Sequence, residues 1–420
     1  MPRRRALTAV ALAIAVASTA SVAPAAAAPH APHAPHAPAD AVRDAEYWLD
    51  AYGIRSAWQV TRGAGVTIAV IDTGVANPRE LQGAVVGGTD VSGEGSSDGR
   101  APVGEDGHHG TLVASLAAGR GTGDGSGVIG SAPEASVLAI SIGFGDDSDD
   151  QIADAVRWAV DNGADVINMS LTRNTLDWPV SWDDAFGYAA EHEVVVVAAA
   201  GNRGSGTDVV GAPATMPGVL TVAGVDTSGA PSHNASTQGV TIGVAAPSES
   251  LVGVMPDGSH VRWSGTSGAA PIVSGVVALV RAAHPELGAA DVINRITSTA
   301  RDAGEPGPDV AYGFGLLDAD AAVRAQVAPV DENPMGDLAE WIRVNRPHEG
   351  GETGIRPGPA PVTREERTAR PFDPVGVLLP SPMLLSRVGA PLLGVLLVAF
   401  IVGGFLAGLV ISYRRGRGAR

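Results

Sequence analysis

The chain has 420 residues, of which 45% are hydrophobic, 17% charged and 4% aromatic, so it can bury a full-sized core and is not a wholly disordered chain. Its basic residues are 28 Arg without any Lys, against 45 acidic residues, for a formal net charge of −17; without the seven Arg of the terminal tails, residues 29–413 carry −24, which disfavours binding to nucleic acid. The absence of Cys excludes disulfides, thiolate metal sites and cysteine nucleophiles.

The first 28 residues have the pattern of a secretory signal peptide. Three Arg at positions 3–5 precede an apolar stretch over 6–17, and small residues follow up to Ala28. A basic start, an apolar core and a small-residue end predict export, with cleavage near Ala28. An uncleaved N-terminal membrane anchor is the alternative, which the short, Ala-rich core disfavours.

Residues 29–40 form a linker in which Pro-His-Ala occurs three times, with histidines at positions 30, 33 and 36. Such a repeat predicts a solvated, extended stretch. A weak metal site built from His30, His33 and His36 is the less favoured alternative.

Between roughly 41 and 328, short apolar runs alternate with helix-like stretches. The runs expected to form buried strands are Val66–Ile71, Val137–Ile142, Asp165–Met169, Val194–Ala199 and Val219–Val225. The expected helices are Thr111–Ala118, Gln151–Asp161, Trp182–His192 and Ala269–Ala283. Fully apolar strands that alternate with helices predict one α/β domain with a mostly parallel sheet.

Three segments of this domain carry side chains suited to nucleophilic catalysis. Asp72 ends an apolar strand, where open α/β sheets form their sites, although a strand-end Asp is often a turn residue. His109 begins an apolar helix, whose positive end favours the neutral imidazole of a general base, although a surface His is equally compatible. Ser267 opens a long helix among small neighbours, as an accessible nucleophile or an ordinary N-cap would.

Beyond the domain, the sequence predicts a spacer and a membrane helix. Residues 329–387 are rich in Pro, Gly and charge, which predicts a semi-extended linker. Residues 388–413 carry no charge, and their length is sufficient for a helix across the roughly 30 Å hydrocarbon layer. The basic tail 414–420 places that end in the cytoplasm. Gly404 and Gly408 could allow close approach of another helix, although Gly is common in membrane helices.

The three candidate segments read Val70-Ile-Asp-Thr-Gly74, His109-Gly-Thr-Leu-Val-Ala114 and Gly265-Thr-Ser-Gly-Ala-Ala-Pro271. With these flanks, and in the order Asp, His, Ser, the chain resembles the subtilase (subtilisin-like, peptidase S8) family of serine proteases. Further matching stretches lie at 127–133, 163–170 and 312–318. The resemblance covers roughly Glu46 to Ala328.

The resemblance implies a subtilisin-like α/β fold and a serine endopeptidase without a cofactor, whose catalytic residues are Asp72, His109 and Ser267. His109 would accept the Ser267 proton, while Asp72 fixes the His tautomer and stabilises its cation. Asn202, after the run 194–199, would donate a hydrogen bond to the oxyanion; a simple Gly-Asn turn is its structural alternative.

The resemblance also makes 165–171 the edge strand that pairs with substrate backbone, with Ser170 and Leu171 as substrate-binding residues lining the cleft. Three departures from the family pattern stand beside the site. Thr172-Arg173 replaces a common Gly, which puts the first specificity pocket in doubt. His108 stands where Gly is usual. Gly268 replaces a larger residue, and we expect it to remove packing behind the nucleophile.

The order of segments as a whole resembles the mycosins, the membrane-anchored subtilases associated with type VII secretion in actinobacteria. Only about 37 residues separate Ala28 from Val66, too few for an independently folded prodomain. Residues 41–60 are expected to form the family's N-terminal lead-in, with Trp58 packing on the body. Mycobacterial mycosins generally carry disulfides, whereas this chain has no Cys.

The resemblance implies an enzyme anchored in the plasma membrane by one helix, with its catalytic domain outside and peptides or proteins as substrates. Its partners would be type VII secretion components, either as substrates or as a membrane complex that the protein stabilises as a scaffold. A cell-surface degradative subtilase unconnected to secretion is the alternative. Acidic loops at 105–106 and 146–150 are compatible with Ca²⁺, but we expect solvated loops and no required metal.

Overall fold

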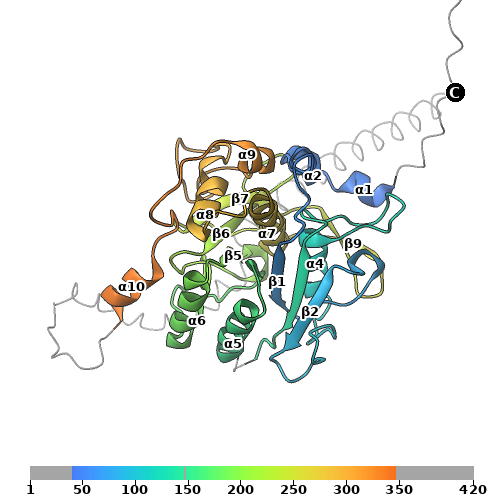
Figure 1. The fold of residues 1–420 in the computed structure, drawn as a ribbon, viewed down its shortest axis with the longest axis horizontal. Helices are drawn as coiled ribbons and strands as arrows, with labels where there is room; N and C mark the ends of the chain where they lie inside the picture. The colour runs from blue at the N-terminus through green and yellow to red at the C-terminus, as the bar shows by residue number, and fades with distance from the viewer. Residues whose placement is uncertain (1–39, 146–147, 347–420) are drawn as a thin grey trace, which may run out of the picture. The chain divides into compact units, whose positions relative to one another are not determined.

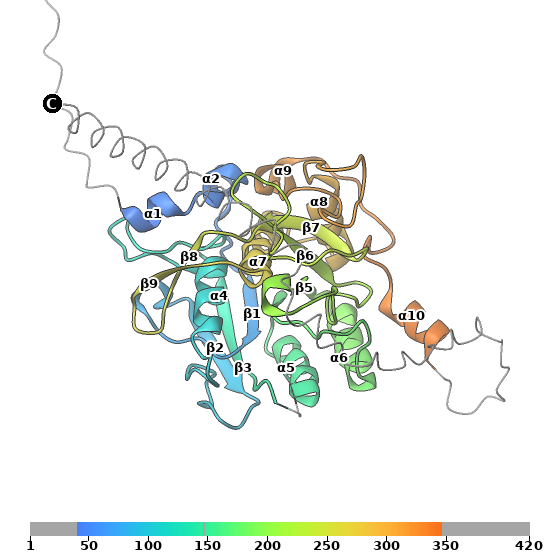
Figure 2. The ribbon, with the colours of Figure 1, turned by 180° about the vertical axis from the view of Figure 1, so that it is seen from behind.

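The computed structural model describes residues 40–145 and 148–346, which build a seven-stranded sheet covered by helices (Figures 1 and 2). The strands are paired in parallel throughout, in the order β2-β3-β1-β4-β5-β6-β7. Their bounds are β1 Thr67–Asp72, β2 Val85–Asp90, β3 Ser136–Ser141, β4 Val166–Met169, β5 Val195–Ala199, β6 Leu220–Val225 and β7 Ile242–Pro247.

Buried strands explain why helices lie on both faces of the sheet. The residues of β4 to β7 are all buried, as are those of β1 and β3 after the first position, so neither face meets water. Helix α4 packs against α7, and α5 packs against α6. The helices of the body are α4 His109–Ala118, α5 Ser148–Asp161, α6 Val180–Glu191, α7 Thr266–Ala283, α8 Ala289–Ser298 and α9 Ala319–Arg324, with short 3-10 turns η1 Arg79–Leu81 and η2 Arg203–Ser205.

The five predicted strands and four predicted helices are all confirmed, with ends that differ by at most three residues. The sequence reasoning missed edge strands β2 and β7, because β2 contains Gly87-Gly88 and β7 mixes Gly, Ala and Pro, all poor strand formers. It also missed the antiparallel hairpin of β8 Leu251–Val254 and β9 His260–Trp263.

Helix α7 is, among the described residues, the one helix long and apolar enough to cross a membrane, but 78% of it is buried inside the body. It is therefore the core helix of the domain. The predicted signal peptide 1–28, the His-containing linker, the membrane helix 388–413 with its glycine pair and the basic tail 414–420 lie outside the described residues.

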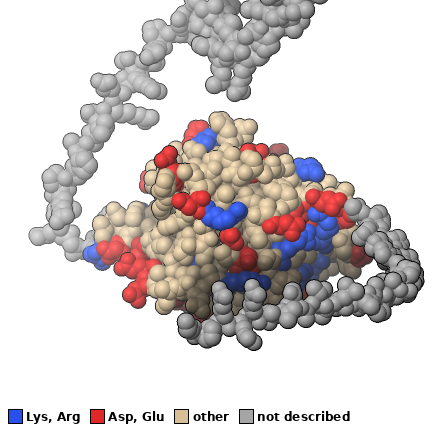
Figure 3. Space-filling model, turned by 90° about the horizontal axis from the view of Figure 1, so that it is seen from above, with Lys and Arg blue, Asp and Glu red and all other residues tan. Residues whose placement is uncertain are grey.

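The surface of the described body mixes charges of both signs on at least one face. Seen from above, over α9 and the N-terminal helix α2 (Trp48–Ala51), acidic and Arg side chains lie next to one another (Figure 3). Such interspersed charge is typical of a solvated surface.

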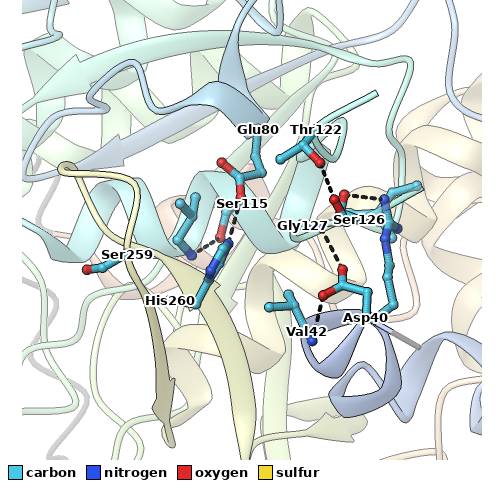
Figure 4. A network of polar contacts seen from close by, with 12 residues as sticks. Asp40, Val42, Glu80, Ser115, Thr122, Ser126, Gly127, Ser259 and His260 are labelled. Carbon is cyan, nitrogen blue, oxygen red and sulfur yellow. Dashed lines mark hydrogen bonds and ion pairs between the residues drawn. The ribbon is translucent and has the colours of Figure 1, made fainter. Parts of the chain in front are cut away.

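The N-terminal segment contains α1 Ala41–Ala45, α2 and α3 Ile54–Ala57. Its side chains hold it on the body by hydrogen bonds to backbone groups. Asp40 caps α1 through Val42 N and accepts from Gly127 N at 2.8 Å, close to a hydrogen bond between Glu80 and His260 (Figure 4). Trp58 Nε1 donates to the Ser131 carbonyl at 2.8 Å, as expected for a packed lead-in.

The first part of the predicted linker 329–387 packs on the body instead of forming an extended spacer. Helix α10, Leu338–Asn345, is capped by Asp337 and places Trp341 against Trp178 with ring centroids 4.3 Å apart. Arg346 then forms an ion pair with Asp183 on α6 at 2.6 Å. The packed region therefore extends to about residue 346, because this stretch carries an amphipathic helix that the Pro-rich composition around it concealed.

Candidate active site

Asp72 and His109 meet at the carboxyl end of the central strand β1. The His109 Nδ1 atom lies 2.8 Å from Asp72 Oδ1 and 3.0 Å from Oδ2. Asp72 is fully buried, and its Oδ1 also accepts from Thr73 N at 2.8 Å. The Thr73 hydroxyl accepts from Gly110 N at 2.9 Å, which ties the start of α4 to the end of β1. A buried carboxylate held in this way fixes both the orientation and the tautomer of the imidazole.

Two opposing effects set the pKa of His109. Burial disfavours the imidazolium, but the charge and hydrogen bond of Asp72, with the charge of Asp106, more than offset it and raise the pKa of His109 above its ordinary value. The neutral imidazole that the helix end favours is therefore opposed by a direct carboxylate contact.

Ser267 is the second residue of α7 and follows Thr266, which is preceded by the N-cap residue Gly265 with φ 153°. Its hydroxyl donates to the Ser170 carbonyl at 3.3 Å, and the Ser170 hydroxyl donates to the Ser267 carbonyl at 2.9 Å. Within the described residues, its hydrogen bonds do not include one to His109. The structure thus brings the helix carrying Ser267 to the end of β4, with the hydroxyl turned toward Ser170.

The Asn202 side chain has a defined orientation after β5. Its Oδ1 accepts from Thr266 N at 2.7 Å and from the Thr266 hydroxyl at 3.0 Å. The Thr266 hydroxyl in turn accepts from Gly201 N at 3.1 Å. Because Oδ1 is occupied, the donor end Nδ2 is the end left for a ligand beside Ser267. The sequence reasoning missed Thr266, although it directly precedes the candidate nucleophile.

Strand β4 is not an edge strand, contrary to expectation, since it lies between β1 and β5. Its backbone groups are used by its neighbours. Substrate pairing is therefore restricted to the residues after Met169. Ser170, Leu171 and Thr172 do line a cavity of about 640 Å³ together with His109.

The departures at Thr172-Arg173 and His108 leave the site assembled. The Arg173 side chain forms an ion pair with Asp149 at 2.5 Å, and the Arg173 backbone N donates to the Ala212 carbonyl at 2.8 Å. His108 precedes α4 as its N-terminal flanking residue and forms no side-chain cap.

The predicted loss of packing at Gly268 is wrong. A Cβ added there would lie 2.3 Å from Leu251 Cδ1 and 3.3 Å from both Leu116 Cδ1 and Trp263. The hairpin residue Leu251, fully buried, occupies the space that a larger residue would fill. Trp263 also faces His109, with ring centroids 5.9 Å apart.

In residues 40–145 and 148–346, no group of three or more His, Asp or Glu side chains is arranged to hold a metal ion. The loop 146–150 lies partly outside the described residues.

Comparisons with known proteins identify the family of this chain. The family model described as "Subtilase family" matches residues 63–315. Mycosin-4 of Mycobacterium tuberculosis is 36% identical over 331 residues, covering 67% of this chain and 70% of that protein. Subtilisin DY of Bacillus licheniformis is 35% identical over 268 residues, covering 63% and 92%.

Solved structures of related proteases are also similar to this chain. The crystal structure of MycP1 from the ESX-1 type VII secretion system is similar with a TM-score of 0.60 and 30% identity, covering 69% of this chain and 88% of that one. The MycP3 protease from the type VII (ESX-3) secretion system has a TM-score of 0.58 and 34% identity, with 67% and 88% covered.

Proposed function

The chain belongs to the subtilase family of serine endopeptidases, and from this premise we propose that it cleaves peptide bonds with Asp72, His109 and Ser267 as its catalytic triad. The observation that carries the proposal is the pair of contacts, 2.8 and 3.0 Å, between His109 Nδ1 and the buried Asp72 carboxylate. The imidazole so held lies at the wall of a cavity of about 640 Å³.

In the proposed reaction, Ser267 Oγ attacks the carbonyl carbon of the scissile bond and His109 Nε2 accepts the hydroxyl proton. Asp72 keeps the Nδ1–H donor in place, which leaves the Nε2 lone pair free for that proton. In the structure the hydroxyl donates to the Ser170 carbonyl, so this contact must break before His109 can accept the proton.

The tetrahedral intermediate carries a negative oxygen that needs a donor. Asn202 Nδ2 is suited to this role because Thr266 holds the other end of the amide. His109 then gives its proton to the leaving amine, which leaves an acyl-enzyme on Ser267. Water attacks this acyl group while His109 accepts a proton from the water, and His109 then returns the proton to Ser267 Oγ as the acid product leaves.

The test compares hydrolysis of a casein substrate by the full chain and by its Ser267→Ala and Ser298→Ala variants. Ser298 is an exposed residue at the end of α8, which makes it a matched control. We expect Ser267→Ala to lower kcat by at least about 10⁴-fold and Ser298→Ala to leave it unchanged. Equal activity of all three proteins would contradict the triad.

For the cellular setting, we propose that the helix 388–413 anchors the protease in the plasma membrane. The catalytic body, which comprises residues 41–328 and the α10 segment, would then lie outside the membrane. The signal peptide 1–28 and the basic tail 414–420 support this topology. Similarity to Mycosin-4 and to proteases of type VII secretion systems supports a role with such a system.

Secretion by cells that carry Ser267→Ala separates proteolysis from a scaffold role. Export that stops in the variant supports proteolysis as the essential function, whereas export that continues supports stabilisation of the secretion complex. Export that also continues after deletion of the whole gene would favour a degradative protease unconnected to secretion.

A further inference from the structure

The cavity beside His109 is bordered by residues that follow four neighbouring strands. Thr73 follows β1, Ser92 and Glu94 follow β2, Ile142 to Gly145 follow β3, and Ser170 to Thr172 follow β4. The carboxyl ends of adjacent parallel strands form the usual binding edge of such sheets. With about 640 Å³, the cavity is large enough for several side chains of a peptide.

Apart from His109, the ionisable side chains that line the cavity are all acidic. Glu94, Glu105 and Asp106 line the cavity and are exposed, and no Arg is among the lining residues. These carboxylates form no ion pair within the described residues. The Arg side chains nearest in sequence are used elsewhere: Arg100 donates to the Ala76 carbonyl at 3.3 Å, and Arg173 pairs with Asp149. Within the described residues, no Arg side chain therefore pairs with these three carboxylates.

Apolar side chains form the rest of the wall. Val103, Ile142 and Leu171 are buried, and Phe144 presents a ring that is 62% exposed. An apolar wall with carboxylates at its rim suits a side chain that has an apolar stem and a cationic head, as Arg and Lys do.

A buried amide also lies at the cavity. Gln151 on α5 is 8% exposed and lines the cavity, and its Oε1 accepts from Gly143 N at 2.7 Å. Within the described residues its Nε2 donates no hydrogen bond to the protein, and this atom is not among the fully buried unpaired atoms, so it remains reachable from the cavity. A donor in this position can bind a ligand that accepts a hydrogen bond, such as a peptide carbonyl.

We propose that this cavity selects substrates that carry an Arg or Lys side chain within four residues of the scissile bond. The basic head lies among Glu94, Glu105 and Asp106, its stem lies along the apolar wall, and a neighbouring peptide carbonyl accepts from Gln151. The proposal rests on the proposed function, since it assigns the substrate class of the same cleft.

The test measures binding, so that it does not depend on turnover. The full-length Ser267→Ala chain is titrated with fluorescent octapeptides of Ala and Leu that carry, at one position in turn, either Arg or its neutral isostere citrulline. Anisotropy gives the Kd. We expect Arg to bind about 10-fold more tightly at one or two positions, as several partly exposed charge pairs acting together would give. The preference shrinks near 1 M salt, where the Debye length is about 3 Å.

Variants of the cavity assign the preference to its residues. Glu94→Gln/Glu105→Gln is compared with Glu191→Gln/Glu305→Gln, which changes the net charge equally at exposed sites outside this cavity. Asp106 is left unchanged because its charge acts on His109. We expect the first pair to reduce the Arg preference to less than about 3-fold, and the second pair to retain it.

Equal affinity for Arg and citrulline peptides, or no binding of the Arg peptides, would overturn the proposal, as would a preference that survives in the cavity variant. Hydrolysis by the unmodified chain is measured in parallel. A chain that binds Arg peptides selectively but cleaves none would refute the proposed protease function and leave the selectivity intact. A chain that cleaves the Arg and citrulline peptides at equal rates would support the protease function and refute the selectivity for basic side chains.

Discussion

Replacing Gly268 by Ala tests how this chain packs the residue behind its candidate nucleophile. The added Cβ would stand 2.3 Å from Leu251 Cδ1, whereas carbon atoms in contact are normally about 3.5–4.0 Å apart. Leu251 must therefore move by more than about 1 Å. It is fully buried, and Leu116 and Trp263 lie 3.3 Å from the same point, so little free space is available.

The expected cost follows from two opposing terms. Overpacking of a dense core typically costs about 1–3 kcal/mol. Ala in place of Gly within a helix returns roughly 0.5–1 kcal/mol. We therefore expect Gly268→Ala to lower the free energy of unfolding by about 1 kcal/mol, within a range of about 0–2.5 kcal/mol.

The assay is equilibrium unfolding in urea, monitored by Trp fluorescence, with every protein carrying Ser267→Ala so that self-digestion does not interfere. Gly187→Ala is the matched control, because Gly187 lies within α6 and an added Cβ would meet nothing within 4 Å. That variant should gain about 0.5–1 kcal/mol. The cost of Gly268→Ala should also shrink in a Leu251→Ala background, since the two side chains compete for one space.

Two results would refute the packing argument. One is a Gly268→Ala variant stabilised as much as Gly187→Ala. The other is a cost that remains the same with and without the Leu251 side chain.

Three further predictions concern ionisable and polar groups. Burial raises the pKa of Glu46 to about 8, against a backbone hydrogen bond from Ile129 and a long 3.6 Å contact with Arg43. The contribution of Glu46 to the free energy of unfolding should therefore be fully present below about pH 4.5 and fall as pH rises to 8. Glu46→Gln should remove this part of the pH dependence and stabilise the chain at pH 8 by a few kcal/mol relative to the unmodified chain, as seen by denaturation of both proteins at several pH values. Asp72→Asn should lower kcat by about 10⁴-fold and, because the charge that raises the pKa of His109 is removed, move the acidic limb of the kcat/KM profile to lower pH. Asn202→Ala should reduce kcat by about 10²–10³-fold with little change in KM, measured on an amide substrate.

Apolar runs were sufficient to predict the central strands, because strands buried on both faces leave a continuous hydrophobic signal. The positions of Asp72 at the end of β1 and of His109 at the start of α4 could also be predicted, because the local sequence pattern sets where each strand ends and each helix begins. Their contact required the parallel pairing that brings strand ends together.

What the sequence could not supply depends on residues far apart in the chain. Leu251 fills the space beside Gly268 through a hairpin that has no strong strand pattern. The pKa of His109 depends on the distance to Asp72, which no local rule for helix ends contains. The orientation of Asn202 depends on Thr266, 64 residues later, and α10 was hidden by the proline-rich composition around it.

The most direct test of the proposed triad is labelling of the full chain with a serine-directed fluorophosphonate, beside its Ser267→Ala variant. We expect one covalent label on the unmodified chain, attached to Ser267 and formed faster as pH rises through the pKa of His109, and none on the variant. A folded chain that takes no label, or a variant that labels as fast as the original, would contradict the assignment of Ser267 as the nucleophile.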